Sequence, residues 1–388
     1  PAVSATRLGE LAPGSIFVVA DGPFCVEDIA WYLVAASAGQ PPLGWTAEGR
    51  NGEYFLEPLL TDAQPISPAD AVGLQSFGAL FAPASAGMTA ANPNGTLAVR
   101  VSDAVQTWRV AGGFTTLDSL AWELLTELPA PHANWHFVDN AGRVWVSGVD
   151  GSANFSLYPL NDSSFVPFVA SGSLASPLVA VDNESSVAAV VVTDPNAVSL
   201  IELHRDATDH TVLLTLAQPG PVQDIAFGPD GMHLYVLAGG QITVYPFVRG
   251  EGWTGQAQQV VTVDLATGTL AVDESGSRLA LSGMLPTGFA AIRIYNNLNT
   301  ETVGDETSVA HDSRDAATFS RASFNPSGSL VAVYAGNNAV NLLDTTTGTV
   351  TFIQLPLAAN LGSVAFTRDG LALLVATEAG IRTYAIRQ

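Results

Sequence analysis

The segment DIAFGPDGMHLYVL, residues 224–237, decides how this chain folds. An apolar strand leads into Gly-Pro-Asp-Gly, and a nearly continuous apolar strand leads out of it. Pro229 fixes a negative φ and Gly231 accepts a positive φ, so these residues favour a tight turn. Such a turn joins two antiparallel strands at close range. The unbroken apolar run after the turn indicates a strand that is buried on both faces.

The same pattern occurs seven times along the chain. Its copies are MTAANPNGTLAVRV (88–101), WHFVDNAGRVWVSG (135–148), LVAVDNESSVAAVVV (178–192), DIAFGPDGMHLYVL (224–237), TLAVDESGSRLALS (269–282), ASFNPSGSLVAVY (322–334) and VAFTRDGLALLVA (364–376). The turn positions are Gly95, Gly142, Ser185, Gly231, Gly276, Gly328 and Gly370, at intervals of 47, 43, 46, 45, 52 and 42 residues. A third apolar strand follows every copy, at 105–110, 155–160, 198–203, 241–245, 291–295, 339–343 and 380–386. A more polar fourth strand follows most copies, for example at 122–128, 212–216, 259–263 and 350–355. Each repeat therefore holds about four strands and no helix.

A four-stranded sheet with two apolar faces cannot bury both faces alone. Seven such sheets arranged radially cover one another face to face, which is the architecture of a β-propeller. The sequence thus predicts an all-β fold: a seven-bladed β-propeller over residues 76–388, with an N-terminal extension or assembly segment of mixed structure over residues 1–75.

The last repeat stops after its third strand, and a ring left with an unpaired edge would be unstable. We expect the missing strand to come from residues 76–83, just upstream of the first copy. In particular, the apolar stretch from Ser76 to Phe81 is predicted to pair beside the stretch from Ile381 to Ile386 and to close the ring.

The first 75 residues lie outside the repeat. Residues 16–20 and 54–60 are expected to form strands. Residues 26–37 are interpreted as a short helix, because two acidic residues fall in its first turn and a glycine and a proline follow its end.

Two resemblances add to this interpretation. Phe227-Gly228-Pro229-Asp230-Gly231 and Phe324-Asn325-Pro326-Ser327-Gly328 are similar to the turns of YVTN/lactonase-like and WD40-like propellers, and this similarity covers residues 76–388. The Trp-Asp dipeptide of WD40 repeats is missing, and Leu343-Asp344 is among its nearest counterparts. Residues 42–62, which contain Leu43-Gly44-Trp45-Thr46, resemble a stretch of long-tailed phage tail-tube proteins. That resemblance implies an assembly element, whereas packing of the extension on the propeller rim is the favoured interpretation.

Composition excludes several classes of protein. The chain has 388 residues, with 14 Arg, no Lys and 36 acidic residues, giving a net charge of −22. Such a charge repels nucleic acid and anionic membranes, so no nucleic-acid partner is expected. The apolar stretches are too short to span a bilayer, so no membrane insertion is expected. Cys25 is the only cysteine, so no disulfide forms within the chain. No signal peptide is visible; either one has been removed or none existed, and a virion or an extracellular surface is the favoured location.

Few residues point to a site. Trp253 lies in a Gly-rich segment and is a candidate ligand or partner contact. The long interval before Gly328 places a polar excursion at residues 296–314, whose candidate contacts are His311, Asp312 and Arg314. No metal site and no cofactor are expected. The catalytic residues remain unknown, because spacing alone cannot choose among the free charged residues Glu27, Asp28, Arg100, Arg109, Asp224 and Arg321.

Two functions remain open from the sequence. The first is a non-catalytic propeller that serves as a structural or protein-interaction module on an assembled outer surface, such as a phage virion component or an exported surface protein. This function implies a protein partner or an assembly. The alternative is a lactonase-like hydrolase acting on a small molecule. For that alternative, the family resemblance implies His, Glu and Arg side chains in a cleft.

Overall fold

The structure is a computed structural model. It describes residues 18–26, 29–35, 42–47, 49–50, 53–54, 63–80, 97–101, 104–110, 122–129, 134–138, 144–147, 155–158, 166–168, 178–182, 187–202, 211–248, 251–297, 307–314, 319–335, 339–355, 362–367, 370–377 and 380–387. The chain divides into two compact units. The first comprises Pro1–Thr61 with Gly112–Thr116, and the second comprises Asp62–Ala111 with Leu117–Gln388.

The first unit contains a three-stranded antiparallel sheet and a short hairpin. The sheet is formed by β1 (Val18–Val26), β2 (Ile29–Ala35) and β3 (Pro42–Ala47), and the hairpin by β4 (Gly49–Arg50) and β5 (Glu53–Tyr54). The short helix expected over residues 26–37 is wrong, because β2 occupies its centre and pairs with both β1 and β3. The apolar run from Ile29 to Val34 is rich in β-branched and aromatic side chains, and these favour a sheet over a helix.

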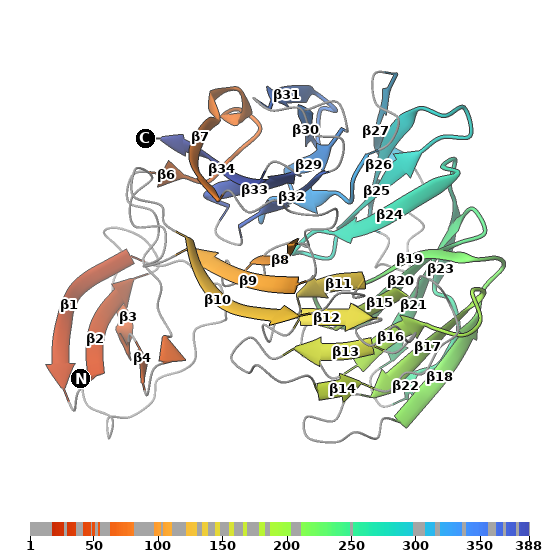
Figure 1. Cartoon of the computed structure of the whole chain (residues 1–388), viewed down its shortest axis with the longest axis horizontal. Coiled ribbons are helices and arrows are strands. Elements are labelled where there is room, and N and C mark those ends of the chain that lie inside the picture. The colour runs from red at the N-terminus through yellow and green to blue at the C-terminus, as the bar shows by residue number, and fades with distance from the viewer. Residues whose placement is uncertain are drawn as a thin grey trace. The chain divides into compact units, whose positions relative to one another are not determined.

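The second unit is built from antiparallel sheets that follow one another in chain order (Figure 1). The first sheet contains β8 (Leu97–Val101), β9 (Ala104–Val110) and β10 (Trp122–Pro129). The second contains β11 (Asn134–Val138), β12 (Val144–Ser147), β13 (Phe155–Tyr158) and β14 (Val166–Phe168). The third contains β15 (Leu178–Val181), β16 (Val187–Val191), β17 (Ala197–Glu202) and β18 (Thr211–Ala217). The fourth contains β19 (Val222–Phe227), β20 (His233–Ala238), β21 (Gln241–Val248), β22 (Gly252–Trp253) and β23 (Gln259–Thr262).

Three further sheets complete the described part of this unit. The fifth contains β24 (Thr267–Val272), β25 (Arg278–Met284), β26 (Ala290–Asn296) and β27 (Thr307–Ser313). The sixth contains β28 (Ser323–Phe324), β29 (Leu330–Tyr334), β30 (Ala339–Asp344) and β31 (Val350–Gln354). The last contains β32 (Gly362–Phe366), β33 (Ala372–Thr377) and β34 (Gly380–Arg387), joined by β6 (Ala63–Gln64) and β7 (Gln75–Leu80). The predicted third strands are confirmed as β9, β13, β17, β21, β26, β30 and β34.

The first strands of neighbouring sheets lie against each other, which is the arrangement of a β-propeller. In this way β15 contacts β19, β19 contacts β24, β24 contacts β28 and β28 contacts β32. Buried apolar clusters fill the space between successive sheets. One of them joins Leu237 and Val244 of the fourth sheet to Leu281 of the fifth. The second unit is thus an all-β propeller whose core lies between the sheets.

The turns between first and second strands have the predicted geometry wherever they are described. φ is 66° at Gly231, 70° at Gly276, 67° at Gly328 and 71° at Gly370. In each case the glycine N–H donates to the carbonyl three residues earlier, for example Gly276 to Asp273 at 3.0 Å. The other three turn positions, 95, 142 and 185, lie outside the described residues.

The expected strand pairing at the end of the chain is present. β7 pairs antiparallel with β34, with Leu80 opposite Ile381 and Gln75 opposite Ala385. Upstream of β7, β6 pairs with the end of the same strand, and a single 3₁₀ turn, η1 (Ala71–Gly73), lies between them. We call residues 63–80 the closing strap.

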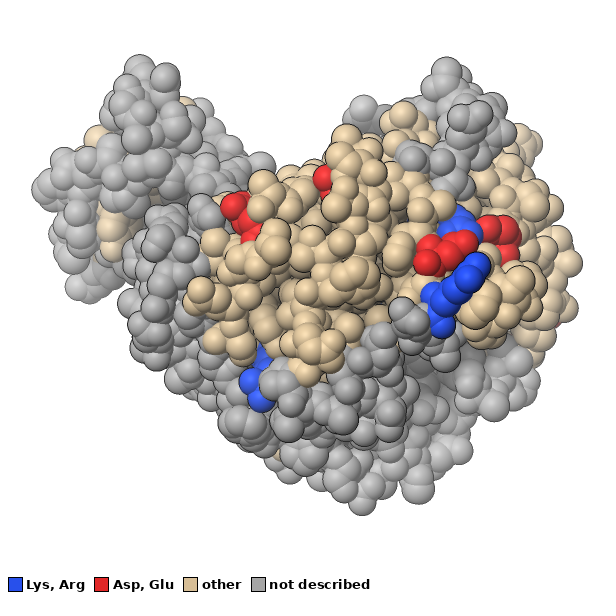
Figure 2. Space-filling view, turned by 90° about the horizontal axis from the view of Figure 1, so that it is seen from above, with Lys and Arg blue, Asp and Glu red and all other residues tan. Residues whose placement is uncertain are grey.

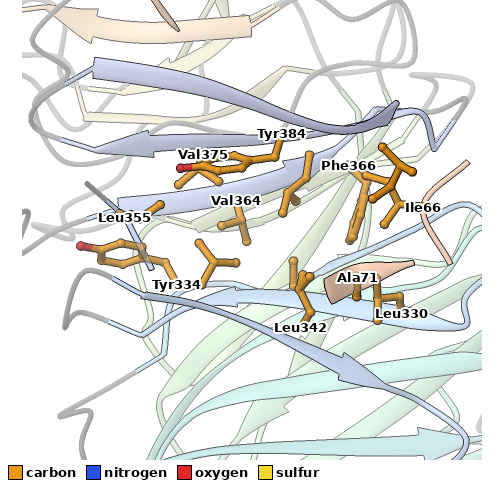
Figure 3. Packing of buried hydrophobic residues seen from close by; sticks show 14 residues of the cluster. Ile66, Ala71, Leu330, Tyr334, Leu342, Leu355, Val364, Phe366, Val375 and Tyr384 are labelled. Carbon is orange, nitrogen blue, oxygen red and sulfur yellow. The ribbon is translucent and has the colours of Figure 1, made fainter. Parts of the chain in front are cut away.

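The closing strap also enters the core between the last two sheets. Ile66 and Ala71 are buried in the cluster that contains Leu330 and Phe366 (Figure 3). The Ile66 N–H donates to the carbonyl of Gly370 at 2.8 Å, and Asn325 donates its side-chain N–H to the carbonyl of Ile66 at 3.0 Å. The closing strap is therefore held by apolar packing, by backbone pairing and by a side-chain hydrogen bond.

The predicted polar excursion at residues 296–314 is wrong in its second half. Residues 307–313 form β27, which pairs along its length with β26 and is the outermost strand of the fifth sheet. Val309 faces the next sheet and belongs to its buried cluster, which explains why this polar stretch is held as a strand. Residues 298–306 lie outside the described residues.

Candidate functional site

A buried carboxylate links three successive sheets near the start of β19. Asp224 Oδ1 accepts a hydrogen bond from Nη2 of Arg321 at 2.5 Å, and Oδ2 accepts one from the Leu270 N–H at 2.7 Å. The Asp224 side chain is 4% exposed, whereas that of Arg321 is 54% exposed. Sequence spacing left both residues unassigned, and the structure brings them together.

The environment of Asp224 opposes its charge. Burial raises the pKa of this carboxyl above its usual value, while Arg321 and the N–H groups of Leu270 and Ile225 act in the opposite direction. A buried charge is tolerated when it is paired and hydrogen-bonded, as it is here. Next to it, Gln223 accepts a hydrogen bond from the Gly268 N–H at 3.0 Å and donates to the Ala266 carbonyl at 3.1 Å. These contacts fasten the fourth sheet to the fifth.

A second ion-pair cluster joins the fifth sheet to the segment that leads into it from the fourth. Arg293 on β26 is 7% exposed and contacts two half-exposed carboxylates, Asp264 at 2.7 Å and Asp312 at 2.6 Å. Arg293 Nη1 also donates to the carbonyl of Ile292. Figure 2 shows acidic and basic side chains gathered side by side on one face of the molecule. Asp312, a predicted contact residue, thus serves to neutralise a buried guanidinium.

The other predicted contact residues occupy different surroundings. His311 is half-buried and its ring stacks on Phe319 at 6.1 Å between centroids. Burial lowers the pKa of His311; Arg293 acts in the same direction and Asp312 in the opposite one. Arg314 is exposed and lies over the ring of Phe289, with 5.9 Å between the guanidinium carbon and the ring centroid.

Trp253 lies in β22, apart from these residues in the chain. Its ring meets Phe227 and Phe247 edge-on, at 5.8 and 5.6 Å between centroids. It packs against the cluster between the third and fourth sheets and is only partly exposed. The structure thus brings His311, Asp312 and Arg314 together on and beside β27, and it places Trp253 in an aromatic cluster on the fourth sheet.

The remaining charged candidates contribute less. Glu27 and Asp28 lie outside the described residues. Arg100 and Arg109 lie in β8 and β9, and their register places Arg100 opposite Val105 and Arg109 opposite Glu123. Among the described residues there is no group of three or more His, Cys, Asp or Glu that could hold a metal ion. Within the part of the chain that the structure describes, no helix is long and apolar enough to cross a membrane.

Exposed apolar side chains are concentrated on outermost strands. Among the residues that the structure describes in the second unit, six large ones are exposed: Val72, Val212, Leu213, Val260, Phe289 and Phe352. Val212 and Leu213 lie in β18, Val260 lies in β23 and Phe352 lies in β31, each of these being the last strand of its sheet in chain order. The sequence predicts that these strands are more polar than the others, which indicates their exposure to solvent. It does not indicate which of their apolar side chains are exposed.

No protein-family model matches the chain, and no curated protein matches it. Among solved structures, the chain is similar to the β-propeller domain of Cps50 (Swd1) from Myceliophteria thermophila. The TM-score is 0.61 and the identity is 13%, over 81% of this chain and 99% of that domain. A likeness at this identity shows the fold, and it agrees with the propeller built up above.

Proposed function

We propose that this chain is a non-catalytic, seven-bladed propeller that acts as a structural or protein-interaction module on an assembled outer surface, such as a phage virion component or an exported surface protein. Each of the sheets described above is taken as one blade. Residues 1–75 are proposed as the extension or assembly segment and residues 76–388 as the propeller, with residues 63–75 of the extension forming the part of the closing strap that joins the last sheet. The partner is a protein, and neither nucleic acid nor membrane insertion is part of the function.

The observation that carries the proposal is the position of the exposed apolar side chains. Val212, Val260 and Phe352 each project from the last strand of a sheet, where a partner can reach them. Exposed apolar groups at a sheet edge favour contact with another chain. The same strands are free of ionisable residues, so the high negative charge of the chain does not repel a partner there.

The charged clusters support the same proposal. Asp224 and Arg321 are engaged with each other and with a backbone N–H, and Arg293 is engaged with two carboxylates. The first cluster fastens neighbouring sheets together, and the second ties the segment between β23 and β24 to β26 and β27. Their role in this proposal is to keep the propeller rigid, so that its outer strands present a fixed surface.

The native particle provides the test. Sedimentation of extracts from the source should place the chain in a particle much larger than 40.2 kDa, with partners identified by mass spectrometry. Val260→Glu should release the chain from that particle, because it adds a charge to an outer strand. Gln256→Glu, in a nearby exposed loop, is the matched control and should leave the particle intact. A chain that sediments as a monomer without partners contradicts the proposal.

A lactonase-like hydrolase is the second candidate, and the half-exposed Arg321 guanidinium is the observation that favours it. An exposed cation next to a buried carboxylate could bind the carbonyl or carboxylate of a small substrate. Turnover of a panel of lactones by the purified chain, abolished in Arg321→Ala, would establish this function. Under the non-catalytic proposal, both proteins leave the lactones unchanged.

A further inference from the structure

Three aromatic side chains meet at one end of the fourth sheet. Trp253 on β22 lies opposite Phe247 on β21, and its ring meets the rings of Phe247 and Phe227 edge-on. Each of the three side chains is partly exposed. Phe227 is the last residue of β19 before the turn, and the other two belong to the hairpin that leaves β21 at the same end. We call Phe227, Phe247 and Trp253 the aromatic cluster.

The position of Trp253 is fixed by the packing on both sides of it. In the hairpin before it, the Glu251 N–H donates to the carbonyl of Val248 at 3.0 Å. After it, Gly255 adopts a φ of 74°, and a Cβ at this position would come within 3.1 Å of the Leu214 side chain in the third sheet. The segment therefore lies directly against the third sheet. A partner would meet rings that are already ordered, which favours binding.

Two carboxylates flank the aromatic cluster. Asp230 follows Phe227 by three residues, and Glu251 precedes Trp253 by two residues. Both are exposed. Asp230 forms a hydrogen bond with Nδ1 of His233 at 2.9 Å. In the described part of the chain, neither carboxylate contacts an Arg.

The sequence around the cluster is acidic as a whole. Residues 178–262, which include the third and fourth sheets, contain nine acidic residues and two Arg. These two, Arg205 and Arg249, lie outside the described residues. An acidic surface attracts cations, and the faces of aromatic rings attract them as well. An anionic partner, or a second copy of this chain with its net charge of −22, would be repelled there. The charge thus favours a basic partner.

We propose that the aromatic cluster is a contact surface for a basic segment of a partner protein, in which a Lys or Arg side chain lies against the ring of Trp253 and pairs with Glu251 or Asp230. The inference rests on the proposed function, because it takes the chain to be a protein-interaction module, and it names the chemistry of one partner. Its failure leaves the outer strands and the particle test of that function untouched, so the two outcomes can be distinguished.

Binding of peptides to the full chain tests the proposal. The probes are three fluorescein-labelled peptides of equal length, built from repeated Arg-Gly-Ser, Gln-Gly-Ser or Glu-Gly-Ser. Fluorescence anisotropy should show binding of the Arg peptide alone, and its affinity should fall as salt rises. Trp253→Leu retains an apolar side chain but removes the ring, and it should weaken this binding by about tenfold. Glu251→Gln should weaken it by about threefold.

Asp194→Asn is the matched control for Glu251→Gln. Asp194 is exposed in the turn between β16 and β17, at the opposite end of the sheets from the aromatic cluster. Its Oδ1 accepts a hydrogen bond from the Asn196 N–H, which an asparagine can also accept. This variant removes the same charge and should leave the binding of the Arg peptide unchanged.

Three results overturn the proposal. The first is an Arg peptide that does not bind, or that binds no better than the Gln peptide. The second is an equal loss in Asp194→Asn and Glu251→Gln, which would reduce the attraction to net charge. The third is unchanged binding in Trp253→Leu. Thermal unfolding checks that this variant is folded; if it is not, the comparison of Glu251→Gln with Asp194→Asn decides alone.

Discussion

Arg321 donates a hydrogen bond to the buried carboxylate of Asp224 although the two residues are 97 positions apart. Each precedes the turn glycine of its own sheet, Gly231 or Gly328, by seven residues. They therefore occupy the same repeat position two sheets apart. Leu270, in the sheet between them, donates its N–H to the other oxygen of Asp224. One carboxylate thus fastens three successive sheets.

Removal of this pair should destabilise the propeller. Arg321→Ala leaves Asp224 buried with only backbone donors, and an unsatisfied buried group costs about 1–3 kcal/mol. We expect a loss of this size in the free energy of unfolding, measured by urea titration with tryptophan fluorescence. Arg314→Ala is the control, because Arg314 is exposed and lies over the partly exposed ring of Phe289, and the loss in this variant should stay within about 0.5 kcal/mol. Equal losses would show that the Asp224 contact contributes nothing.

The stability of the chain should also depend on His311. Burial lowers the pKa of His311 below its usual value of 6.5, so the unfolded chain takes up this proton at a higher pH than the folded chain does. Between the two values the unfolded state binds more protons, and stability falls as the pH falls. Below the folded value this contribution is fully lost.

Comparison of the chain with His311→Phe isolates this contribution. The phenyl ring can still stack on Phe319 but does not titrate, so the variant should lose less stability than the parent between pH 7.5 and pH 5.5. At lower pH, Asp224 changes the stability in the opposite direction. Its raised pKa makes the folded state bind a proton more readily than the unfolded state does, so its contribution to stability rises as the pH falls. Parallel pH profiles of the two proteins would contradict the role of His311.

Two glycines with positive φ allow the cost of backbone conformation to be separated from the cost of steric crowding. Gly240 and Gly328 both have positive φ, at 75° and 67°. A Cβ on Gly240 meets nothing within 4 Å, whereas one on Gly328 comes within 2.7 Å of Asp273 Oδ2 and 3.0 Å of Arg278 Nη1. Gly240→Ala should lower the free energy of unfolding only by the cost of placing an alanine at positive φ, about 1–2 kcal/mol. Gly328→Ala should cost about 1–3 kcal/mol more from crowding. Thermal unfolding of the two variants checks the difference, and identical losses would exclude a steric contribution.

The repeated turn made the propeller predictable from sequence. Its glycine, present in six copies and joined by a proline in three, favours a tight local turn, and local geometry can be read from neighbouring residues. A further local signal was missed. The residue three positions before the turn position is Asp182, Asp273, Asn325 or Thr367 in four copies, and its side chain accepts a hydrogen bond from the N–H five residues further on. Alignment of the copies on their turns would have exposed this position.

Contacts between sheets were not predictable in the same way. Asp224 and Arg321 share a repeat position, but the sequence does not say which sheets approach closely enough for side chains to meet. The helix expected at residues 26–37 failed for a related reason. Its acidic first turn is a local signal, whereas the strand observed there is held by pairing with two other segments of the first unit. Tertiary pairing outweighed local preference.

The closing strap gives the last prediction. Asn325 serves two purposes: its side-chain oxygen accepts the Leu330 N–H at 2.9 Å, and its side-chain N–H donates to the carbonyl of Ile66 at 3.0 Å. Asn325→Asp keeps the first contact, since Asp273 makes the same one in the fifth sheet, and it loses the second. The variant should therefore weaken the attachment of the strap while the turn stays intact.

Ile66→Ala tests the same attachment through packing, and truncation of a buried isoleucine costs about 2–5 kcal/mol. Both variants should speed amide hydrogen exchange in β6 and β7, and then in the facing strand β34, before the rest of the propeller opens. Exchange in the fourth and fifth sheets should stay slow, because the contacts of Asp224 and Arg293 are untouched. If exchange accelerates evenly across all sheets, the strap is not an independent closure, and the ring opens only as a whole.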